Sequence, residues 1–189
     1  MNISDFTFWL DDLKKDLDER LSQSLYRQLI PSHQQGSILV REGQSLLNLA
    51  GNDYLALSSH PDIKAAATLA IEQMGVGSGA SKLVTGHLPQ TQALEKTFAA
   101  FKHAQAALLF PTGYMANLGV LTCLTDERDV ICIDKLTHAS LIDASHASRA
   151  TVRVYPHGNT HKLQRLLQRH AHCRRRVIVT DSVFSMDGD

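Results

Sequence analysis

The sequence lacks several features that would point to particular classes of partner. It has no net charge, with 19 Lys plus Arg and 19 Asp plus Glu, so nothing in it predicts a nucleic acid or an acidic surface as partner. No apolar run approaches the ~20 residues of a membrane helix, and the stretch MNISDFTFWLDDLKKD is charged too early for a signal peptide. Cys123, Cys132 and Cys173 are widely spaced and odd in number, which fits neither a disulfide framework nor a zinc site. We therefore expect a cytoplasmic protein that binds neither a membrane nor a nucleic acid.

The N-terminal part of the chain is predicted to form a helix followed by a β-hairpin. Apolar residues recur at every third or fourth position, which indicates an amphipathic helix of about six turns that Pro31 ends. These residues are Phe6, Trp9, Leu10, Leu13, Leu17, Leu21 and Leu25. Short apolar runs at 38–40 and 46–49 flank Glu42 and Gly43, which is a hairpin signal.

Farther along, helical patterns and apolar runs alternate. A helix is predicted from Pro61 to Met74, with Gly75 as its stop. The apolar runs lie at 106–110, 130–134, 151–155 and 177–183, with helical segments near 114–124, 138–148 and 161–170. Such alternation is typical of an α/β fold with a mainly parallel sheet and helices on its faces. We assign residues 1–50 to an N-terminal segment and residues 51–189 to the first part of a large α/β domain.

Three loops follow the predicted strands at the carboxyl edge of this sheet, where ligands gather in such folds. They span 111–114, 135–138 and 184–189. The first, with the sequence PTG, separates the run AALLF from a helix that begins at Tyr114. A helix start presents free N–H groups and about half a positive charge, which suits a phosphate, and Gly113 would let the phosphate approach closely. An ordinary turn with nothing bound is the alternative.

His138, Ser185 and a glycine-rich stretch each allow two interpretations. His138 follows the run VICID at a helix start. It is either a capping or surface residue, or a ring that stacks on a planar ligand or hydrogen-bonds a carboxylate. Ser185 lies in FSMDGD, where turn chemistry accounts for Ser, Asp and Gly, and two acids alone do not make a metal site. Residues 75–80 fit G-x-G-x-x-[GA], but they follow a helix rather than a strand, so we interpret the dinucleotide match as accidental.

Several segments together resemble one known family across nearly the whole chain. They are NDYL at 52–55, GVGSGASKLVTG at 75–86, LLFPTGYMAN at 108–117, DKLTHASL at 134–141 and VTDSVFSMDGD at 179–189. In their order and spacing they resemble the α-oxoamine synthase family of pyridoxal-phosphate enzymes. The resemblance implies fold type I, with an N-terminal helix and hairpin before the domain that binds pyridoxal 5′-phosphate.

The resemblance also assigns cofactor contacts by matching position. Gly113 and Tyr114 match the step whose backbone meets the cofactor phosphate at a helix start. His138 matches the histidine that stacks on the pyridine ring and lies near the substrate carboxylate. Ser185 matches the serine that hydrogen-bonds the phenolic oxygen of the cofactor. No metal is implied.

Three further residues match positions on the substrate side. Arg27, in LYRQL, matches an arginine near the acyl substrate, and Asn52 and Tyr54 match a loop that borders the active site. The implied reaction is a decarboxylative condensation of L-alanine with a pimeloyl thioester, on coenzyme A or a carrier protein, in biotin biosynthesis. The resemblance also implies that the full-length protein is a homodimer. Members of the 2-amino-3-ketobutyrate ligase, 5-aminolevulinate synthase and serine palmitoyltransferase types are the alternatives within the family.

Some elements of the family pattern have no match in this sequence. These are an Asp-x-x-His pair and the Schiff-base lysine, which stand later in the family's chains. No lysine of this chain stands in a matching context, although Lys82 lies in the glycine-rich loop. We therefore expect an N-terminal half that has no synthase activity alone. A non-catalytic truncated protein and a nucleotide-binding module at 75–80 are the alternatives from other functional classes.

Overall fold

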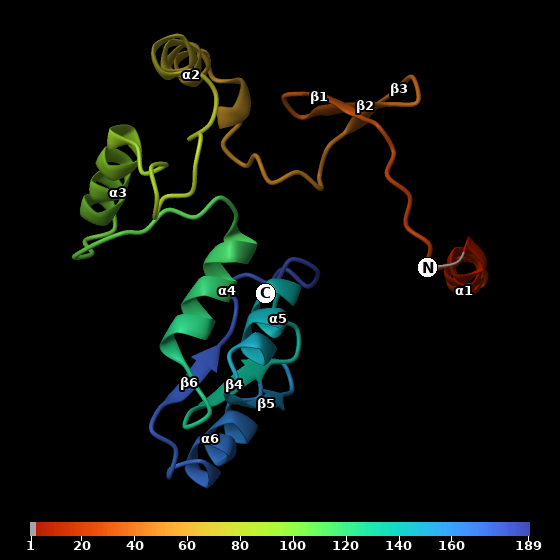
Figure 1. Cartoon of the computed structure of the whole chain (residues 1–189), viewed down its shortest axis with the longest axis vertical. Helices are drawn as coiled ribbons and strands as arrows, with labels where there is room; N and C mark the ends of the chain where they lie inside the picture. The colour runs from red at the N-terminus through yellow and green to blue at the C-terminus, as the bar shows by residue number, and fades with distance from the viewer. Residues whose placement is uncertain (1–2) are drawn as a thin grey trace. The chain divides into compact units, whose positions relative to one another are not determined.

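The computed structural model describes residues 3–189. The chain divides into two compact units, one extending to Gly77 and the other spanning Ser78–Asp189 (Figure 1), and each is described by itself. No helix in the described part of the chain has the length and apolar character needed to cross a membrane. The predicted domain boundary at residue 50 stays a prediction, since these units are defined by packing and not by cofactor binding.

The first unit begins with a helix and a small antiparallel sheet. Helix α1 spans Ile3–Ser22, so the predicted N-terminal helix is present, but it ends well before Pro31. The side chains of its apolar stripe are exposed within the chain; they are Trp9, Leu10, Leu13, Leu17 and Leu21. Phe6 belongs to the predicted stripe but lies outside the described side chains. A helix whose apolar side chains find no tertiary contact depends on its own propensity, which limits its length.

The predicted hairpin is confirmed and gains a third strand. Strands β1 (His33–Gln35), β2 (Ile38–Arg41) and β3 (Gln44–Leu47) pair in that order, all antiparallel. Glu42 and Gly43, between β2 and β3, both have positive φ, at 50° and 77°. Two such residues in succession make the tight turn whose twist matches that of a hairpin.

A short 3-10 turn, η1 (Leu57–Ser59), leads from the small sheet into α2 (Pro61–Met74), which has the predicted bounds. Pro61 occupies the first turn, where its missing N–H costs nothing, and the side chain of His60 accepts a hydrogen bond from the N–H of Asp62. Gly75 ends the helix with φ 76°, a conformation that glycine adopts without strain.

The second unit is an α/β unit around a parallel sheet. Its elements, in chain order, are α3 (Pro89–Phe101), α4 (Gly113–Leu124), β4 (Val130–Asp134), α5 (Ala139–Ala147), β5 (Thr151–Tyr155), α6 (Thr160–Arg169) and β6 (Arg176–Val179). The strand order is β5-β4-β6, and both pairings are parallel. The structure therefore confirms the predicted parallel sheet and its crossover helices.

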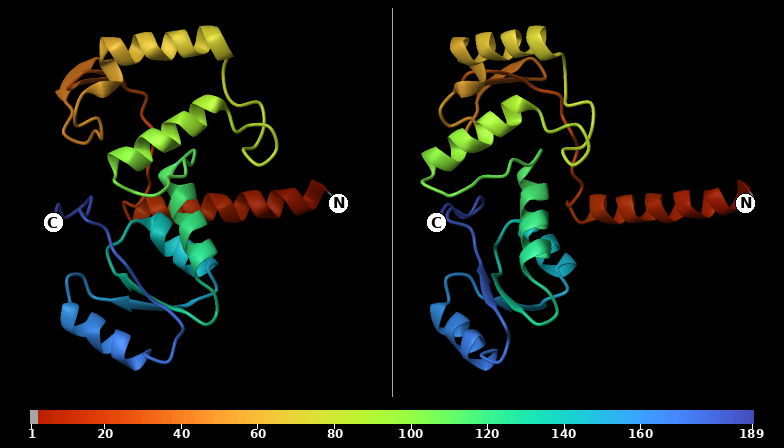
Figure 2. Two further views of the ribbon diagram at one scale, coloured as in Figure 1. Left: turned by 90° about the vertical axis from the view of Figure 1, so that its left-hand side faces the viewer. Right: turned by 60° about the vertical axis from the view of Figure 1, so that its left-hand side comes forward.

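Strand β4 is the centre of this unit, and every one of its residues is buried. Ile131 and Ile133 pack with Leu121 of α4 and Ala144 of α5. Val130 and Cys132 instead belong to a cluster on the opposite face, which also contains Tyr155 of β5 and Leu166 of α6. Alternation along the strand thus places α4 and α5 on one face and α6 on the other, as Figure 2 shows.

Two strand predictions were wrong. Residues 106–110 form no strand in the described chain, and Leu108 is 66% exposed. Strand β6 ends at Val179, not at residue 183. An apolar run forms a strand only beside a neighbour that accepts and donates its backbone hydrogen bonds, and the described part of the chain provides none at 106–110.

Candidate functional site

The amino-terminal ends of α4 and α5 and the loop after β6 lie at the end of the second unit to which its strands point (Figures 1 and 2). This is the carboxyl edge at which ligands of α/β sheets bind. The predicted cofactor residues all lie in these three segments.

The start of α4 leaves two backbone donors open. The side chain of Thr112 caps the helix by accepting from the N–H of Met115, at 3.1 Å. The N–H groups of Gly113 and Tyr114 donate no hydrogen bond within the described residues. A Cβ built on Gly113 would meet no atom within 4 Å, so the space in front of this turn is open. Two free donors at a helix start, beside a position without a side chain, fit an anion such as a phosphate.

His138 caps the start of α5, as one of its two interpretations predicted. Its Nδ1 accepts from the N–H of Ser140 at 3.2 Å and lies 2.7 Å from the hydroxyl of the same residue. That hydroxyl also accepts from the side-chain amide of Asn117 on α4, at 2.9 Å. Because Nδ1 accepts, the neutral ring carries its proton on Nε2, and Nε2 has no partner within the described residues. The ring therefore keeps one donor for a ligand.

Further hydrogen bonds hold the three segments together. The backbone N–H of His138 donates to the carboxylate of Asp181, just beyond β6, at 2.8 Å. The hydroxyl of Tyr114 donates to the carboxylate of Asp143 on α5, at 2.7 Å. This hydrogen bond is the main cause that raises the pKa of the Tyr114 phenol above its usual value, so the phenol stays protonated.

Ser185 lies in a turn that is anchored on each side. The N–H of Gly188 donates to the carbonyl of Phe184, and the ring of Phe184 is buried edge-on against His157, with centroids 4.4 Å apart. The hydroxyl of Ser185 is exposed and makes no hydrogen bond within the described residues. It is therefore available to a ligand at this edge.

His157 joins this turn to the sheet. Its two ring nitrogens lie 3.0 Å from the carboxylate of Asp134 and 3.1 Å from that of Asp189. Hydrogen bonds to Asp134 and then to Asp189 raise the pKa of the His157 imidazole. Burial raises the pKa of the Asp134 carboxyl, but hydrogen bonds from the N–H of Leu136, from His157 and from the N–H of Gly158 outweigh burial and lower it.

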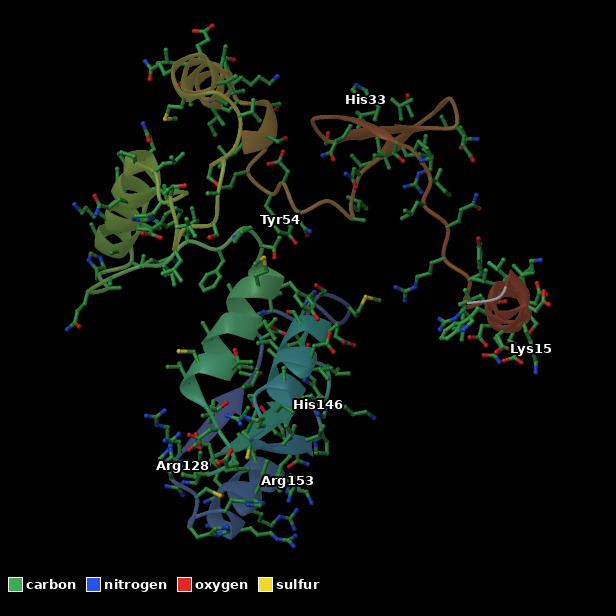
Figure 3. The ribbon with its side chains drawn as sticks, viewed as in Figure 1. Lys15, His33, Tyr54, Arg128, His146 and Arg153 are labelled. Carbon is green, nitrogen blue, oxygen red and sulfur yellow. The ribbon has the colours of Figure 1, made fainter. Side chains whose placement is uncertain are left out.

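The predicted substrate residues lie in the first unit. Arg27 is exposed beside a surface hollow after α1. Asn52 and Tyr54 lie on the loop between β3 and η1, and Tyr54 is 87% exposed (Figure 3). Exposed polar and aromatic side chains on a loop are open to a ligand, and their roles stay predictions.

Sequence reasoning missed the residues that support this site. Asp181, Asn117 and Asp143 were not singled out, although Asp181 lies in a segment that carried the family resemblance. The one available signal was an acidic side chain inside the predicted apolar run at 177–183, where a buried strand would not be expected to carry one. Its partner, His138, is 43 residues away, and no pattern in the sequence predicts a contact over that separation.

One cluster elsewhere in the described residues has the ligand types of a metal site. His170, His172 and Cys173 hold their donor atoms within 4.8 Å of one another. Arg153 of β5, labelled in Figure 3, donates to Nε2 of His170 at 3.2 Å, and its guanidinium lines the same hollow as that of Arg174. Burial and then the charge of Arg153 lower the pKa of His170. A cation would meet these positive charges, so the cluster is poorly suited to one.

The chain is similar to curated synthases and to solved structures. It is 46% identical over 175 residues to the 8-amino-7-oxononanoate synthase of Geobacter sulfurreducens, covering 92% of this chain and 45% of that protein. It is 38% identical to the enzyme of the same name from Bacillus pumilus, covering 99% of this chain and 47% of that protein. The chain thus spans about half the length of the curated relatives it matches.

Two solved structures resemble the model. A variant of serine palmitoyltransferase from S. paucimobilis, solved with a bound aldimine of pyridoxal phosphate and myriocin, has a TM-score of 0.83 at 25% identity, covering 95% of this chain and 46% of that one. The 8-amino-7-oxononanoate synthase of Francisella tularensis has a TM-score of 0.61 at 34% identity, covering 72% of this chain and 37% of that one. These likenesses confirm the predicted fold type I.

The model of one protein family matches most of the chain. It is described as aminotransferase class I and II, and it covers residues 44–189. The pyridoxal phosphate named for the serine palmitoyltransferase structure is the cofactor that the sequence predicted. The chain belongs to the aminotransferase class I and II family.

Proposed function

We propose that this chain forms the part of a pyridoxal 5′-phosphate site that holds the phosphate and the ring. The observation that carries the proposal is the pair of free N–H groups at Gly113 and Tyr114, beside an α5 start at which His138 keeps Nε2–H free. Ser185, with an exposed hydroxyl at the same edge, would donate to the phenolic oxygen of the cofactor.

The residues fit such a group in charge as well as in position. A helix start carries about half a positive charge, which favours a phosphate dianion. The Asn117–Ser140 pair fixes the tautomer of His138, so its ring can lie against the cofactor while Nε2–H donates to a substrate carboxylate. Asp181 holds the backbone of His138 in place for both roles.

The proposed reaction is that of an α-oxoamine synthase, in which L-alanine condenses with a pimeloyl thioester and loses carbon dioxide. When bound, the cofactor supplies an electron sink for the negative charge at the α-carbon of the amino acid. Arg27, Asn52 and Tyr54 would contact the substrates, and the working enzyme would be a homodimer. The 46% identity to a synthase of this reaction supports the choice over serine palmitoyltransferase, at 25%.

The dinucleotide alternative at 75–80 has less support. The motif follows α2 directly, whereas a dinucleotide fingerprint follows a strand and opens a helix. Saturable binding of NAD would revive this alternative.

Amino-acid selectivity tests the proposed reaction. L-alanine, glycine and L-serine are each titrated into protein loaded with pyridoxal phosphate, and the absorbance of the cofactor is followed. We expect L-alanine to change the spectrum at the lowest concentration. A preference for glycine or serine would replace the alanine assignment by one of the other family reactions.

The polypeptide of residues 1–189 is itself proposed to have no synthase turnover. Lys82, which lies in the glycine-rich loop, is 2.6 Å from the carboxylate of Glu95, and no other lysine stands in a matching context. We expect no condensation product from L-alanine and pimeloyl-CoA by mass spectrometry. A product would contradict the proposal that the catalytic lysine lies outside residues 1–189.

A further inference from the structure

We call the free N–H groups of Gly113 and Tyr114 the phosphate seat. The segment that precedes this seat is held in place without a neighbouring strand. Residues 104–110 connect the turn after α3 to Pro111, and they join no sheet among the described residues. Leu109 is 40% exposed and lies four residues before Gly113. The position of the seat therefore depends on what fixes this segment.

Two side chains satisfy both polar backbone groups of Leu109. Oε1 of Glu95, on α3, accepts from the N–H of Leu109 at 2.9 Å and from Nζ of Lys82 at 2.6 Å. The same Nζ donates to the carbonyl of Leu109 at 2.9 Å. The ion pair thus takes the place of an adjacent strand at this residue. We call the arrangement of Lys82, Glu95 and Leu109 the clasp.

The carboxylate of the clasp is well placed to stay ionised. The side chain of Glu95 is 13% exposed, and that of Lys82 is 35% exposed. The N–H of Leu109 and then the ammonium of Lys82 lower the pKa of Glu95. His87 is the other titratable group nearby, with Nε2 4.0 Å from the second carboxylate oxygen.

The loop that carries Lys82 is itself tightly closed. The N–H groups of Val84 and Gly86 both donate to the carbonyl of Ser81. A Cβ on Gly86 would lie 1.9 Å from the carbonyl oxygen of Ala80, so only glycine fits there. The loop thus fixes the residue that provides the ammonium.

Phe110, the residue after Leu109, is held by a contact with α4. The ring of Phe110 packs on α4, where a Cβ built on Gly119 would lie 3.0 Å from it. Pro111 then restricts the backbone of Phe110, and Thr112 caps the helix. Between the clasp and the free N–H groups of the seat, little freedom is left.

We propose that Lys82 and Glu95 are positioning residues for the phosphate seat at Gly113 and Tyr114. The inference rests on the proposed function. An anion site made of two backbone N–H groups has no flexible side chain that can reorient toward the ligand. Its geometry therefore depends on the backbone segment that precedes it. Loosening Leu109 therefore weakens phosphate binding, although neither clasp side chain belongs to the seat.

The test compares two ligands that differ only in the phosphate. Pyridoxine 5′-phosphate and pyridoxine both lack the aldehyde that would react with surface lysines. Their dissociation constants are measured by calorimetry on the 189-residue chain, and the phosphate preference is their ratio. In Lys82→Met and in Glu95→Met we expect the preference to fall about tenfold, since misaligning a hydrogen bond to a charged group costs about that factor.

The two single variants also separate positioning from simple charge. Lys82→Met removes a positive charge and Glu95→Met a negative one, so a long-range electrostatic effect would weaken phosphate binding in the first and strengthen it in the second. Under the proposal both weaken it, and the double variant loses no more than either single one. Opposite signs would overturn the proposal.

Three further variants serve as controls. Lys102→Met makes the same substitution on a lysine over the ring of Phe101, outside the clasp, and should keep the preference. Lys82→Arg and Glu95→Gln keep a donor and an acceptor for Leu109 and should keep most of it. If the methionine variants fail to fold, Glu95→Gln decides, because an effect of charge would raise its preference above the wild-type value.

The outcomes separate this inference from the proposed function. A wild-type chain that binds both ligands equally has no phosphate seat, and the proposed function fails with the inference. A wild-type preference that survives in both methionine variants overturns the clasp alone. Loss of preference in both, with the native amide spectrum kept, supports the clasp.

Discussion

Strand β4 and the segment at 106–110 have similar apolar sequences but different structures. Both were predicted as buried strands, yet β4 is buried throughout, whereas Leu108 is 66% exposed. Strand β4 has β5 on one side and β6 on the other, while the other segment has the side chains of Lys82 and Glu95. An apolar run therefore indicates only that a segment can be buried. The elements next to it in space determine whether it becomes a strand.

The largest expected effect tests this difference in burial directly. Ile131→Ala in β4, a fully buried position, should lower the free energy of unfolding by about 2–5 kcal/mol through lost transfer energy and a cavity. Leu108→Ala, the matched control, should change it by less than about 0.5 kcal/mol. Urea unfolding followed by circular dichroism measures both. Equal losses would show that residues 106–110 are buried in solution.

A second variant acts on the loop that replaces a strand neighbour. Gly86→Ala places a methyl group 1.9 Å from the carbonyl oxygen of Ala80, so it should cost about 1–3 kcal/mol of stability. Gly113→Ala meets no atom within 4 Å and should leave the unfolding midpoint nearly unchanged while it weakens binding of pyridoxine 5′-phosphate. A stable Gly86→Ala protein would mean that the loop has room to open.

A smaller effect is expected at the start of α4. Thr112→Ala removes the cap that accepts from the N–H of Met115 and should cost about 1 kcal/mol. Thr112→Ser keeps the hydroxyl and serves as the control. Thermal unfolding measures both variants, and the alanine variant should also place one more free N–H at the seat. An unchanged melting temperature in Thr112→Ala would contradict the assigned cap.

The smallest effect is a pH dependence at the turn after β6. The pKa of His157 is raised in the folded chain, so its contribution is complete below its unfolded value of about 6.5 and is lost as the pH rises through the higher folded value. The difference in melting temperature between the wild type and His157→Gln should shrink over that window. A difference that grows with rising pH would contradict the ion pairs with Asp134 and Asp189.

The lowered pKa of Asp134 sets the acid side of the same window. Its contribution is present above the unfolded value of about 3.9 and is lost as the pH falls through the lower folded value. The turn that carries Ser185 should therefore be held best between these two limits.

Local signals predicted much of the fold. Helix α2 begins at Pro61 and ends at Gly75 because both residues constrain the backbone by themselves, and β4 and β5 have the predicted bounds. The elements that failed depend on distant residues. Whether 106–110 forms a strand, and where β6 stops, is decided by neighbours that the local pattern does not contain.

The site divides in the same way. Gly113, Tyr114, His138 and Ser185 could be found because each lies beside a predicted strand end, and the segments that carry them lie at one end of the second unit (Figure 1). The residues that fix them act across the chain: Asp181 on His138 over 43 residues, and Lys82 on Leu109 over 27. Such contacts follow from the tertiary structure and leave no periodic trace in the sequence.

The proposed function depends above all on the free N–H groups at the start of α4, which are proposed to bind the cofactor phosphate. Amide spectra of the nitrogen-15-labelled chain, titrated with pyridoxine 5′-phosphate and separately with pyridoxine, test it most directly. We expect the signals of Gly113 and Tyr114 to shift most with the phosphate ester and to stay in place with pyridoxine. Equal shifts with both ligands, or shifts confined to other residues, would contradict it.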